Sequence, residues 1–468
     1  MDNKQKVVKN ANNKASEDEL VFDSVPKSDI VPIYRMNERP KTWFETIIYG
    51  LQTTLVDFTP FIWATAFVTG AGADPELIPP MISACFFAMF FATLIQTVLG
   101  NRLPIVQGPS AALVASMSGV ARIFGLPAVW GAAFIGGIAE WALGASKLLK
   151  HLRRALPMVI VGCIITTIGF SASKVAVQWV FGGADPLNIF LAFLTLVVAL
   201  IFKFACQNVW GGILERGFVL FSVLVVGVGV GTLTGNMDWG AVAAAKWFAL
   251  PTLFPHGGPG FGWAFSIPAI IGVSVGYLAS IVESIGGYAA TCAVIDEPYT
   301  VRHMNRGIAA EGAGCALAPC LGALPMTSYA QNIGVIAATR VASRFVIQVA
   351  AFFFLLYSLS PKLATFLAAI PRGSTGGCFV LVAALITTQG LNLVTTETLG
   401  TRNGVLVGST LGLALGVPPF IQQNLGEWVS SLNPLLQLLL TDSIVIAVVW
   451  GFLLNGILNL AGSKAESS

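Results

Sequence analysis

Long apolar runs, each followed by a short polar or charged segment, recur along the chain from about residue 46 onward. A helix that crosses the hydrocarbon core of a membrane needs about 20 mostly apolar residues, and most of the runs approach or exceed that length. The pattern predicts an all-α polytopic membrane protein with fourteen transmembrane spans. The predicted spans are 46–69, 78–99, 104–121, 126–146, 156–172, 186–206, 217–235, 265–293, 306–322, 325–340, 343–359, 374–395, 403–416 and 442–461.

Composition agrees with this pattern. Of the 468 residues, 55% are hydrophobic and 10% are charged, and the mean hydropathy is +0.77. Soluble domains carry about 25% charged residues, so a soluble globule is excluded. A net charge of +3 provides no basic footprint for nucleic acid. The seven cysteines and three histidines lack metal-ligand spacing, so we expect no metal and no cofactor.

Basic residues divide unequally between the two sides of the predicted membrane. Residues 1–42 are polar, lack the apolar segment of a cleavable signal peptide, and predict a disordered tail. Of the 26 Lys and Arg residues, 21 fall on the side of this tail. The positive-inside rule therefore predicts a cell-membrane protein with both termini cytoplasmic. The other side receives Arg122, Lys174, Lys246, Lys362 and Arg372.

Two short sequences occur twice. Leu103-Pro104 opens LPIVQGPSAALVA, and Leu324-Pro325 opens LPMTSYAQNIGVIA about 220 residues later. Leu156-Pro157 and Ile370-Pro371 repeat at nearly the same offset. The chain thus reads as two halves of seven spans. An odd number of spans per half makes the halves insert with opposite orientation, which predicts the inverted repeats of secondary transporters.

The duplicated segments also predict interrupted helices. In spans 3 and 10, proline and glycine are combined with residues that favour extended backbone, and helix should resume near Ser110 and Asn332. A helix that starts at mid-membrane presents unpaired N–H groups and the positive end of its dipole. Non-helical backbone at that depth requires burial in protein or a cavity. The two breaks therefore predict a binding site between the halves.

Carboxylates inside membrane spans are costly and usually functional. Four lie within the body of the spans, at Asp57, Glu140, Glu283 and Glu311. Glu140 lies near the predicted cytoplasmic end of span 4, and we interpret it as structural, facing water or pairing with Lys147. Asp57 and Glu311 fit either a functional or a structural role. Glu283 lies in the middle of a long span without a nearby basic residue, which indicates a functional role.

A family resemblance is carried by four blocks in order. QNIGVIAATR, from Gln331 to Arg340, satisfies every fixed position of the signature of the nucleobase–ascorbate transporter family. VESIGGY around Glu283, NRGIAAEG ending at Gly312, and IVQGPSAA in span 3 support the match. The chain resembles this family from about residue 46 to residue 461.

The resemblance implies a fold of two inverted seven-span repeats that form a core and a gate domain. The tail 1–42 would precede the core (43–147 and 265–360), the gate would comprise 148–236 and 361–462, and 237–264 would be an extracytoplasmic loop. It also implies an elevator-like motion of core against gate within a homodimer. The implied substrates are nucleobases or ascorbate, driven by protons or sometimes by sodium.

The resemblance further implies the site residues. Glu283 would bind ring N–H groups of the substrate, and Gln331 would bind its amide-like edge. Backbone N–H groups near Ala111 and Ala330 would hold carbonyl oxygens. Asn332 would brace the break in span 10. Gln52 and Thr53 occupy the position of a Gln-His pair that the family often has in span 1, and ion coupling would fall to Glu283, Glu311 or Asp57.

Three positions depart from the family pattern. Thr53 replaces histidine, Gly287 replaces aspartate or histidine, and Ala111 replaces an aromatic residue. All three changes make the inferred pocket less bulky or less ionisable, and Asp57, one helical turn from Thr53, could replace the lost ionisable group. Glutamine at position 331 resembles the purine-transporting members, whereas uracil-type members tend to have glutamate there.

The resulting prediction is a proton-coupled purine permease, with xanthine or urate as the leading substrates. Alternatives are transport of uracil or another small planar or enolic acid, and sodium coupling. An uncoupled facilitator would not need the buried carboxylates. A membrane-embedded enzyme is disfavoured because HExxH, GxSxG and Walker motifs are absent from the sequence. A related anion-exchanger family is thought to share the fold but lacks the QNIG block.

Overall fold

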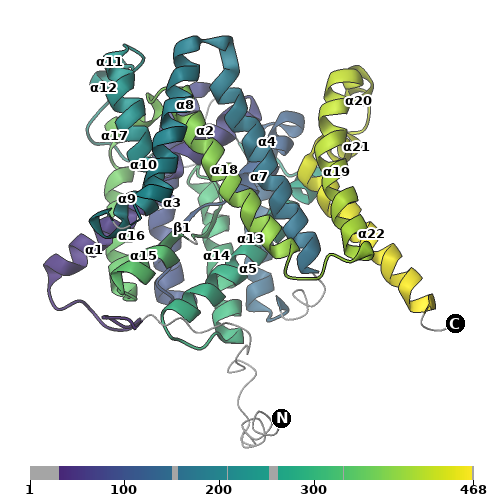
Figure 1. The fold of residues 1–468 in the computed structure, drawn as a ribbon, viewed down its shortest axis with the longest axis horizontal. Helices are drawn as coiled ribbons and strands as arrows, with labels where there is room; N and C mark the ends of the chain where they lie inside the picture. The colour runs from purple at the N-terminus through teal and green to yellow at the C-terminus, as the bar shows by residue number, and fades with distance from the viewer. Residues whose placement is uncertain (1–30, 150–156, 208, 252–261, 330, 466–468) are drawn as a thin grey trace, which may run out of the picture.

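The structure is a computed structural model that describes residues 31–149, 157–207, 209–251, 262–329 and 331–465. It is mostly helical, with 78% of residues in helices. Ala330, most of the tail, and residues 252–261 of the predicted loop lie outside the described residues. Figure 1 shows the helices standing side by side around the short strand β1.

The first part of the chain forms helices that alternate with short irregular turns of helix. Its elements are α1 (Trp43–Val56), α2 (Pro60–Ala71), η2 (Pro75–Leu77), α3 (Ile78–Leu94), η3 (Ile95–Leu99), β1 (Gln107–Pro109), α4 (Ala111–Phe124), α5 (Leu126–Ala145), α7 (Met158–Phe181), η4 (Gly182–Ala184), α8 (Pro186–Leu200), η5 (Ile201–Ala205), η6 (Val209–Gly212), α9 (Ile213–Arg216), α10 (Phe218–Ser222), η7 (Val223–Val230), α11 (Gly231–Leu233) and α12 (Trp239–Ala244).

The second part begins with the longest helix that the structure describes. Its elements are α13 (Ile267–Val294), α14 (Val301–Cys320), β2 (Met326–Ser328), α15 (Gln331–Thr339), α16 (Arg344–Ser358), α17 (Pro361–Ala368), α18 (Arg372–Val394), α19 (Thr401–Asn424), α20 (Gly426–Ser430), α21 (Pro434–Thr441) and α22 (Ser443–Ala465).

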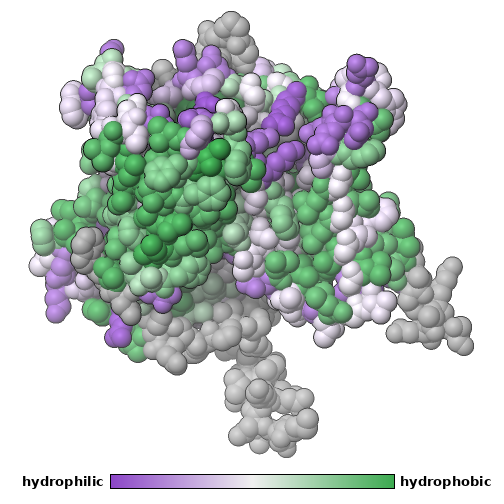
Figure 2. Space-filling model, turned by 45° about the horizontal axis from the view of Figure 1, so that its top comes forward, coloured by the Kyte–Doolittle hydropathy of each residue, from purple (hydrophilic) through white to green (hydrophobic). Residues whose placement is uncertain are grey.

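Among the described residues, seven helices are long and apolar enough to cross a membrane, or up to nine if each sharply bent pair counts as one span. The bent pairs are α16 with α17 and α21 with α22, at 82° and 85°. Figure 2 shows hydrophobic residues over most of the visible face, with hydrophilic residues gathered toward its upper rim. Such a surface suits a lipid environment.

Predicted span 1 is not one continuous helix. Helix α1 ends at Val56, with Asp57 as its C-cap, and α2 starts with Pro60 after a break of three residues. Proline favours the first turn of a helix because its missing N–H is unpaired there in any case. The break leaves Asp57 fully buried at the end of α1.

Three sets of helices pack closely. Helix α5 packs along α14, and α13 contacts both α4 and α5. Helix α7 packs along α18, which also contacts α8. Helices α19, α21 and α22 pack on one another, and α19 and α22 also contact α7. In Figure 1 the α19–α22 group stands at one side of the molecule, coloured yellow-green to yellow.

The two short strands pair in the interior. β1 and β2 are antiparallel, with Gln107 opposite Ser328 and Pro109 opposite Met326. The Ser110 N–H donates to Pro325 O at 3.1 Å, and the Tyr329 N–H donates to Val106 O at 3.0 Å. Extended backbone thus occurs in both segments for which the sequence predicts it, and the strands satisfy each other's buried polar groups.

Glycine is required at one position of this pair. A Cβ at residue 108 would overlap the ring of Tyr329, the residue that follows β2. That ring packs against β1, and its hydroxyl lies 2.9 Å from Thr59 Oγ1. Helix α4 begins directly after β1, at Ala111, with the Ser110 side chain accepting from the Leu113 N–H as N-cap. Helix α15 begins at Gln331, shortly after β2. The pair therefore brings two helix starts to the centre of the molecule.

Candidate functional site

A buried carboxylate is the centre of the polar interior beside the strands. Glu311 of α14 is 0% exposed. Its oxygens accept from Ser284 Oγ at 2.6 and 2.8 Å, from the Tyr288 hydroxyl at 3.0 Å and from Ser328 Oγ at 2.8 Å. Ser284 and Tyr288 lie four residues apart on α13 and so share one face of that helix. Three hydroxyl groups from α13 and β2 thus converge on Glu311.

The hydrogen bonds continue into both strands. Gln107 Nε2 of β1 donates to Ser328 Oγ at 2.7 Å, and the Gln107 N–H donates to Thr93 Oγ1 of α3 at 3.0 Å. Ser328 therefore accepts a hydrogen bond from Gln107 and donates one to Glu311. Thr327 Oγ1 lies 3.0 Å from Ser284 Oγ and completes the network. Linked hydrogen bonds of this kind hold their members in fixed positions.

Glu283 differs from its neighbour Ser284. It is half-buried on α13 and has no hydrogen-bond partner among the described residues. Its carboxylate interacts electrostatically with that of Glu311. Gly286 and Gly287 lie three and four residues along the same helix, and a Cβ on either would meet nothing within 4 Å. The helix surface beside Glu283 is therefore open at both glycines, and both Glu283 oxygens lack a hydrogen-bond donor among the described residues.

The start of α15 holds the signature residues. Gln331 is exposed, whereas Asn332 is 1% exposed and its amide atoms have no hydrogen-bond partner. The Asn332 amide interacts with the buried carboxylate of Asp57. The two groups are not placed for a regular hydrogen bond, and neither has another hydrogen-bond partner among the described residues. Asn332 also lines a small cavity of about 10 Å³ together with Thr53. The structure thus brings Asp57, Thr53 and Asn332 together.

The remaining predicted site residues are placed as follows. Ala111 is the first residue of α4, so its N–H is among those without an intrahelical partner. Gln52 is half-buried on α1. The Thr53 hydroxyl donates to Tyr49 O at 2.9 Å, within its own helix. Ala330 lies outside the described residues.

The interpretation of Glu140 requires a correction. Glu140 does not face water, since it is 2% exposed, and its oxygens have no hydrogen-bond partner among the described residues. It therefore does not pair with Lys147. Helix α5 packs along α14, and this packing directs Glu140 toward Glu311, with which it interacts electrostatically. Two carboxylates thus share one apolar interface.

Sequence reasoning missed the hydroxyl groups around Glu311. Ser284 follows Glu283 directly, and Tyr288 lies four residues after Ser284. That spacing places the two hydroxyl groups on one helix face and could have indicated a shared polar partner. Gln107 lies in the duplicated segment of span 3, opposite Ser328 in that of span 10. No local pattern in the sequence reveals that these residues meet Glu311, because the strand register brings them together.

Apolar helices around a buried polar site, with two helix starts meeting at a paired strand break, define a multi-pass membrane transporter. The comparisons agree. The chain belongs to the Permease family, whose model matches residues 44–422, and the predicted membership in the nucleobase–ascorbate transporter family is confirmed. The chain is a transporter and not an enzyme.

Curated relatives resemble the chain over most of its length. A putative purine permease, CPE0397, of Clostridium perfringens (strain 13 / Type A) is 26% identical, with 90% of this chain and 92% of the relative covered. The uric acid transporter UacT of Escherichia coli (strain K12) is 26% identical, covering 88% and 86%. The xanthine permease XanQ of Escherichia coli (strain K12) is 26% identical, covering 82% and 86%.

Solved structures show the same fold. The transmembrane domain of the cyanobacterial bicarbonate transporter BicA matches with a TM-score of 0.56 at 14% identity, covering 89% of this chain and 98% of that one. The murine anion transporter Slc26a9 in an inward-facing state matches with a TM-score of 0.61 at 11% identity, covering 91% and 70%. At these identities the likeness concerns the fold alone.

Proposed function

We propose that this protein carries a purine nucleobase such as xanthine or urate across the cell membrane by proton symport. The observation that carries the proposal is Glu283, a half-buried carboxylate with no hydrogen-bond partner among the described residues, on the helix α13 that contacts β2. An ionised carboxylate is an acceptor-only group and suits adjacent ring N–H donors. The relatives that are named as purine, uric acid and xanthine permeases support this substrate class.

The substrate in this proposal lies between α13 and the starts of α4 and α15. Glu283 accepts from its ring N–H groups, and Gln331 offers both a donor and an acceptor to its amide-like edge. The N–H groups at Ala111 and Ala330 hold carbonyl oxygens, which the positive ends of the two helix dipoles favour. Asn332 braces α15, and Gln52 and Thr53 border the site from α1.

Proton coupling in this proposal uses the buried carboxylates. Glu283 lies within electrostatic reach of Glu311, and Glu140 lies within reach of the same group. Adjacent like charges in an apolar interior are unfavourable, so uptake of one proton by the cluster relieves repulsion and permits substrate to bind. Asp57 beside Asn332 is the second coupling candidate. Sodium coupling is the alternative that the ion test below decides.

The transport motion that we propose is an elevator movement of a core against a gate. The core comprises 43–147 and 265–360, and the gate comprises 148–236 and 361–462. The close packing of α5 with α14 and of α7 with α18 supports this grouping. Fourteen spans in two inverted repeats, interrupted at β1 and β2, cytoplasmic termini and a homodimer belong to the same proposal.

Ligand panels and imposed gradients test the function. Purified protein is screened by thermal shift against purines, pyrimidines and ascorbate, because a ligand that binds only the folded state raises its stability. Proteoliposomes are then assayed for uptake of the best ligand under a pH gradient or a sodium gradient. We expect a purine to stabilise the protein and a pH gradient to drive its accumulation. Stabilisation by ascorbate alone would refute the purine substrate. Accumulation driven only by a sodium gradient would refute proton coupling.

Glu283→Gln is the decisive variant. It preserves the shape of the side chain but removes the charge and converts one acceptor into a donor. A hydrogen bond to a charged group contributes about 1.5–3 kcal/mol, which is a loss of about ten- to hundred-fold in affinity. Glu297→Gln serves as the matched control, since Glu297 is also half-buried but lies beyond the C-terminal end of α13, outside the carboxylate cluster. Equal purine affinity in Glu283→Gln and the parent would show that Glu283 does not touch the ligand.

A further inference from the structure

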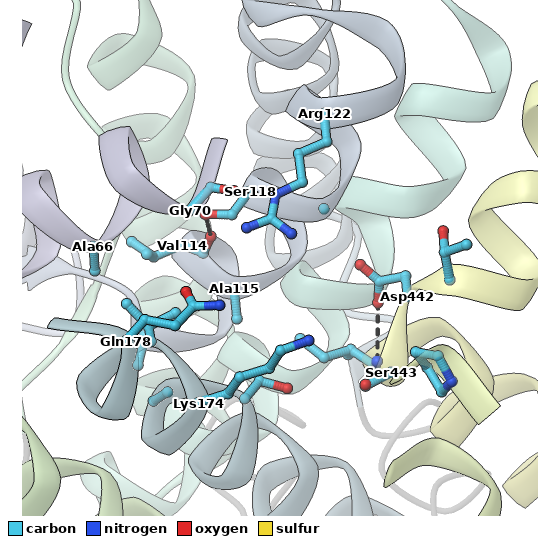
Figure 3. Close-up of a pocket in the computed structure, with 18 of the residues that line it drawn as sticks. Ala66, Gly70, Val114, Ala115, Ser118, Arg122, Lys174, Gln178, Asp442 and Ser443 are labelled. Atoms are coloured by element: carbon cyan, nitrogen blue, oxygen red, sulfur yellow. Dashed lines mark hydrogen bonds between the residues drawn. The ribbon is translucent and has the colours of Figure 1, made fainter. Parts of the chain in front are cut away.

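A second polar cavity lies between α4 and the C-terminal helices. Its volume is about 130 Å³, and its walls come from α2, α4, α7, α18, α19 and the bend between α21 and α22. Three charged side chains line it: Arg122, Lys174 and Asp442. Figure 3 shows Arg122 and Lys174 reaching into the cavity from different helices, with the Gln178 amide also directed toward it.

The two cations of this cavity repel each other. Arg122 on α4 and Lys174 on α7 are both exposed and interact electrostatically. The Arg122 Nε–H donates to Gly70 O, and its terminal N–H groups have no hydrogen-bond acceptor among the described residues. Lys174 has no hydrogen bond or ion pair to the described residues. Two like charges held by separate helices indicate a site for an anion.

The one carboxylate that lines the cavity, Asp442, is capped by backbone N–H groups and interacts electrostatically with Arg122. Asp442 is 7% exposed and caps α22, with its Oδ1 accepting from the N–H groups of Ile444 and Val445 at 2.9 and 3.0 Å. Its other oxygen lies against Gly119, where any Cβ would overlap it. The cap partly satisfies Asp442. Two cations and one carboxylate leave the cavity a net charge of +1, which matches a monoanion.

The deep wall of the cavity is apolar and aromatic. Trp63 and Phe379 line it and are 7% and 1% exposed, with their rings edge to face at a centroid distance of 5.5 Å. Ala111, the first residue of α4, also lines the cavity. Aromatic side chains suit contact with a planar ring, and Ala111 connects the cavity to the proposed substrate position.

We infer that this cavity is a second binding site, which captures a planar heterocyclic monoanion through Arg122 and Lys174 before it reaches Glu283. The inference rests on the proposed function, and it adds a preference for the anionic form of the ligand. The negative charge is held at the two cations, the ring lies toward Trp63 and Phe379, and the amide of Gln178 is available to ring N–H or carbonyl groups.

The test compares a charged and an uncharged purine. Urate is a monoanion at neutral pH, and hypoxanthine is neutral there. Binding of each is measured by calorimetry on full-length protein carrying Lys174→Gln or Arg122→Gln/Lys174→Gln. Lys246→Gln, another exposed cation that the sequence places on the same side, is the matched control. Lys174 has no hydrogen-bond or ion-pair partner among the described residues, so Lys174→Gln tests the charge without removing such a contact.

Charge-selective loss is the expected result. Lys174→Gln should weaken urate binding about five-fold and the double variant more than about ten-fold, with hypoxanthine changed by less than about two-fold. Raising ionic strength from about 0.1 to 1 M shortens the Debye length from about 10 to 3 Å and should weaken urate binding in the parent more than in the double variant. Equal losses for both purines, or no loss for either, would overturn the inference.

Glu283→Gln separates this inference from the proposed function. In that background weak urate binding should persist, and Arg122→Gln/Lys174→Gln should then abolish it. If Glu283→Gln changes the affinity for neither urate nor hypoxanthine, the proposed role of Glu283 in substrate binding is wrong. A charge-selective loss of urate affinity in the double variant would still support an anion site in the cavity. If residual urate binding in Glu283→Gln is unaffected by loss of both cations, the cavity is not an anion site, whatever Glu283 does.

Discussion

Replacing Glu311 by glutamine perturbs the most highly connected carboxylate that the structure describes. Three hydroxyl groups donate to Glu311, from Ser284, Tyr288 and Ser328. Glutamine has nearly the same shape, and its Oε1 can accept two of the three donors. Ser284 can then rotate its hydroxyl and accept from the new Nε2. Every partner stays hydrogen-bonded, so the variant removes the charge while preserving the contacts.

The expected loss of stability follows from comparing hydrogen bonds to a charged and to a neutral acceptor. A hydrogen bond to a charged group contributes about 1.5–3 kcal/mol, against about 1 kcal/mol for a neutral one, so each of the three contacts loses about 1 kcal/mol. The expected destabilisation of ligand-free protein is therefore about 3 kcal/mol if Glu311 is ionised in the resting state. Unfolding of purified protein in a denaturing detergent titration measures it.

Glu140→Gln provides the control for this measurement. Glu140 is equally buried, but both of its oxygens lack a hydrogen-bond partner among the described residues. Removing its charge removes a desolvation cost and a repulsion with Glu311, so this variant should be as stable as the parent or more stable. If Glu311→Gln leaves stability unchanged, Glu311 is neutral in the resting protein. Equal destabilisation by Glu140→Gln would refute the reasoning from hydrogen bonds.

Three further variants test other features. Gln331→Glu removes a donor and adds a charge at the start of α15, so purine uptake should fall and uracil-like ligands should gain; unchanged purine affinity in binding assays would place the side chain away from the ligand. Gly108→Ala should destabilise the protein by about 1–3 kcal/mol, because the new Cβ overlaps the Tyr329 ring. Gly286→Ala is the control, because its Cβ meets open space; it should stabilise the protein by less than about 1 kcal/mol. A larger loss of unfolding free energy in Gly286→Ala than in Gly108→Ala would contradict the packing. A reporter fused after Ser468 should be accessible only from the cytoplasm, and labelling from outside would exclude the fourteen-span topology.

The features that were predictable from sequence are those with a local cause. Proline, glycine and β-branched residues around Gln107 and Thr327 indicated extended backbone, and strands occur there. The apolar runs indicated a multi-pass membrane protein, and the QNIGVIAATR block indicated the family. The break at Asp57 was missed because the run 46–69 is long enough and apolar enough for one span, and only Asp57 and Pro60 mark the interruption.

Features that depend on tertiary packing were not predictable. Glu140 was expected to face water or Lys147, but the packing of α5 along α14 turns it toward Glu311. The hydroxyl groups on Glu311 come from α13 and β2, and their meeting depends on a strand register that no local pattern encodes. The cavity at Arg122 likewise joins residues more than 300 positions apart, such as Arg122 and Asp442.

The strand pair has a consequence for biosynthesis. β1 leaves the ribosome about 220 residues before β2, and at about 5–20 residues per second this interval lasts about 10–40 s. During that time the backbone of Gln107–Pro109 has no strand to pair with, and an unpaired sheet edge is not tolerated in hydrocarbon. The N-terminal half therefore remains incompletely folded during this interval, with its unpaired strand shielded by its own helices or by the insertion machinery. Neither half can reach its native structure alone, and separately synthesised halves should fold only when each supplies the other's missing strand.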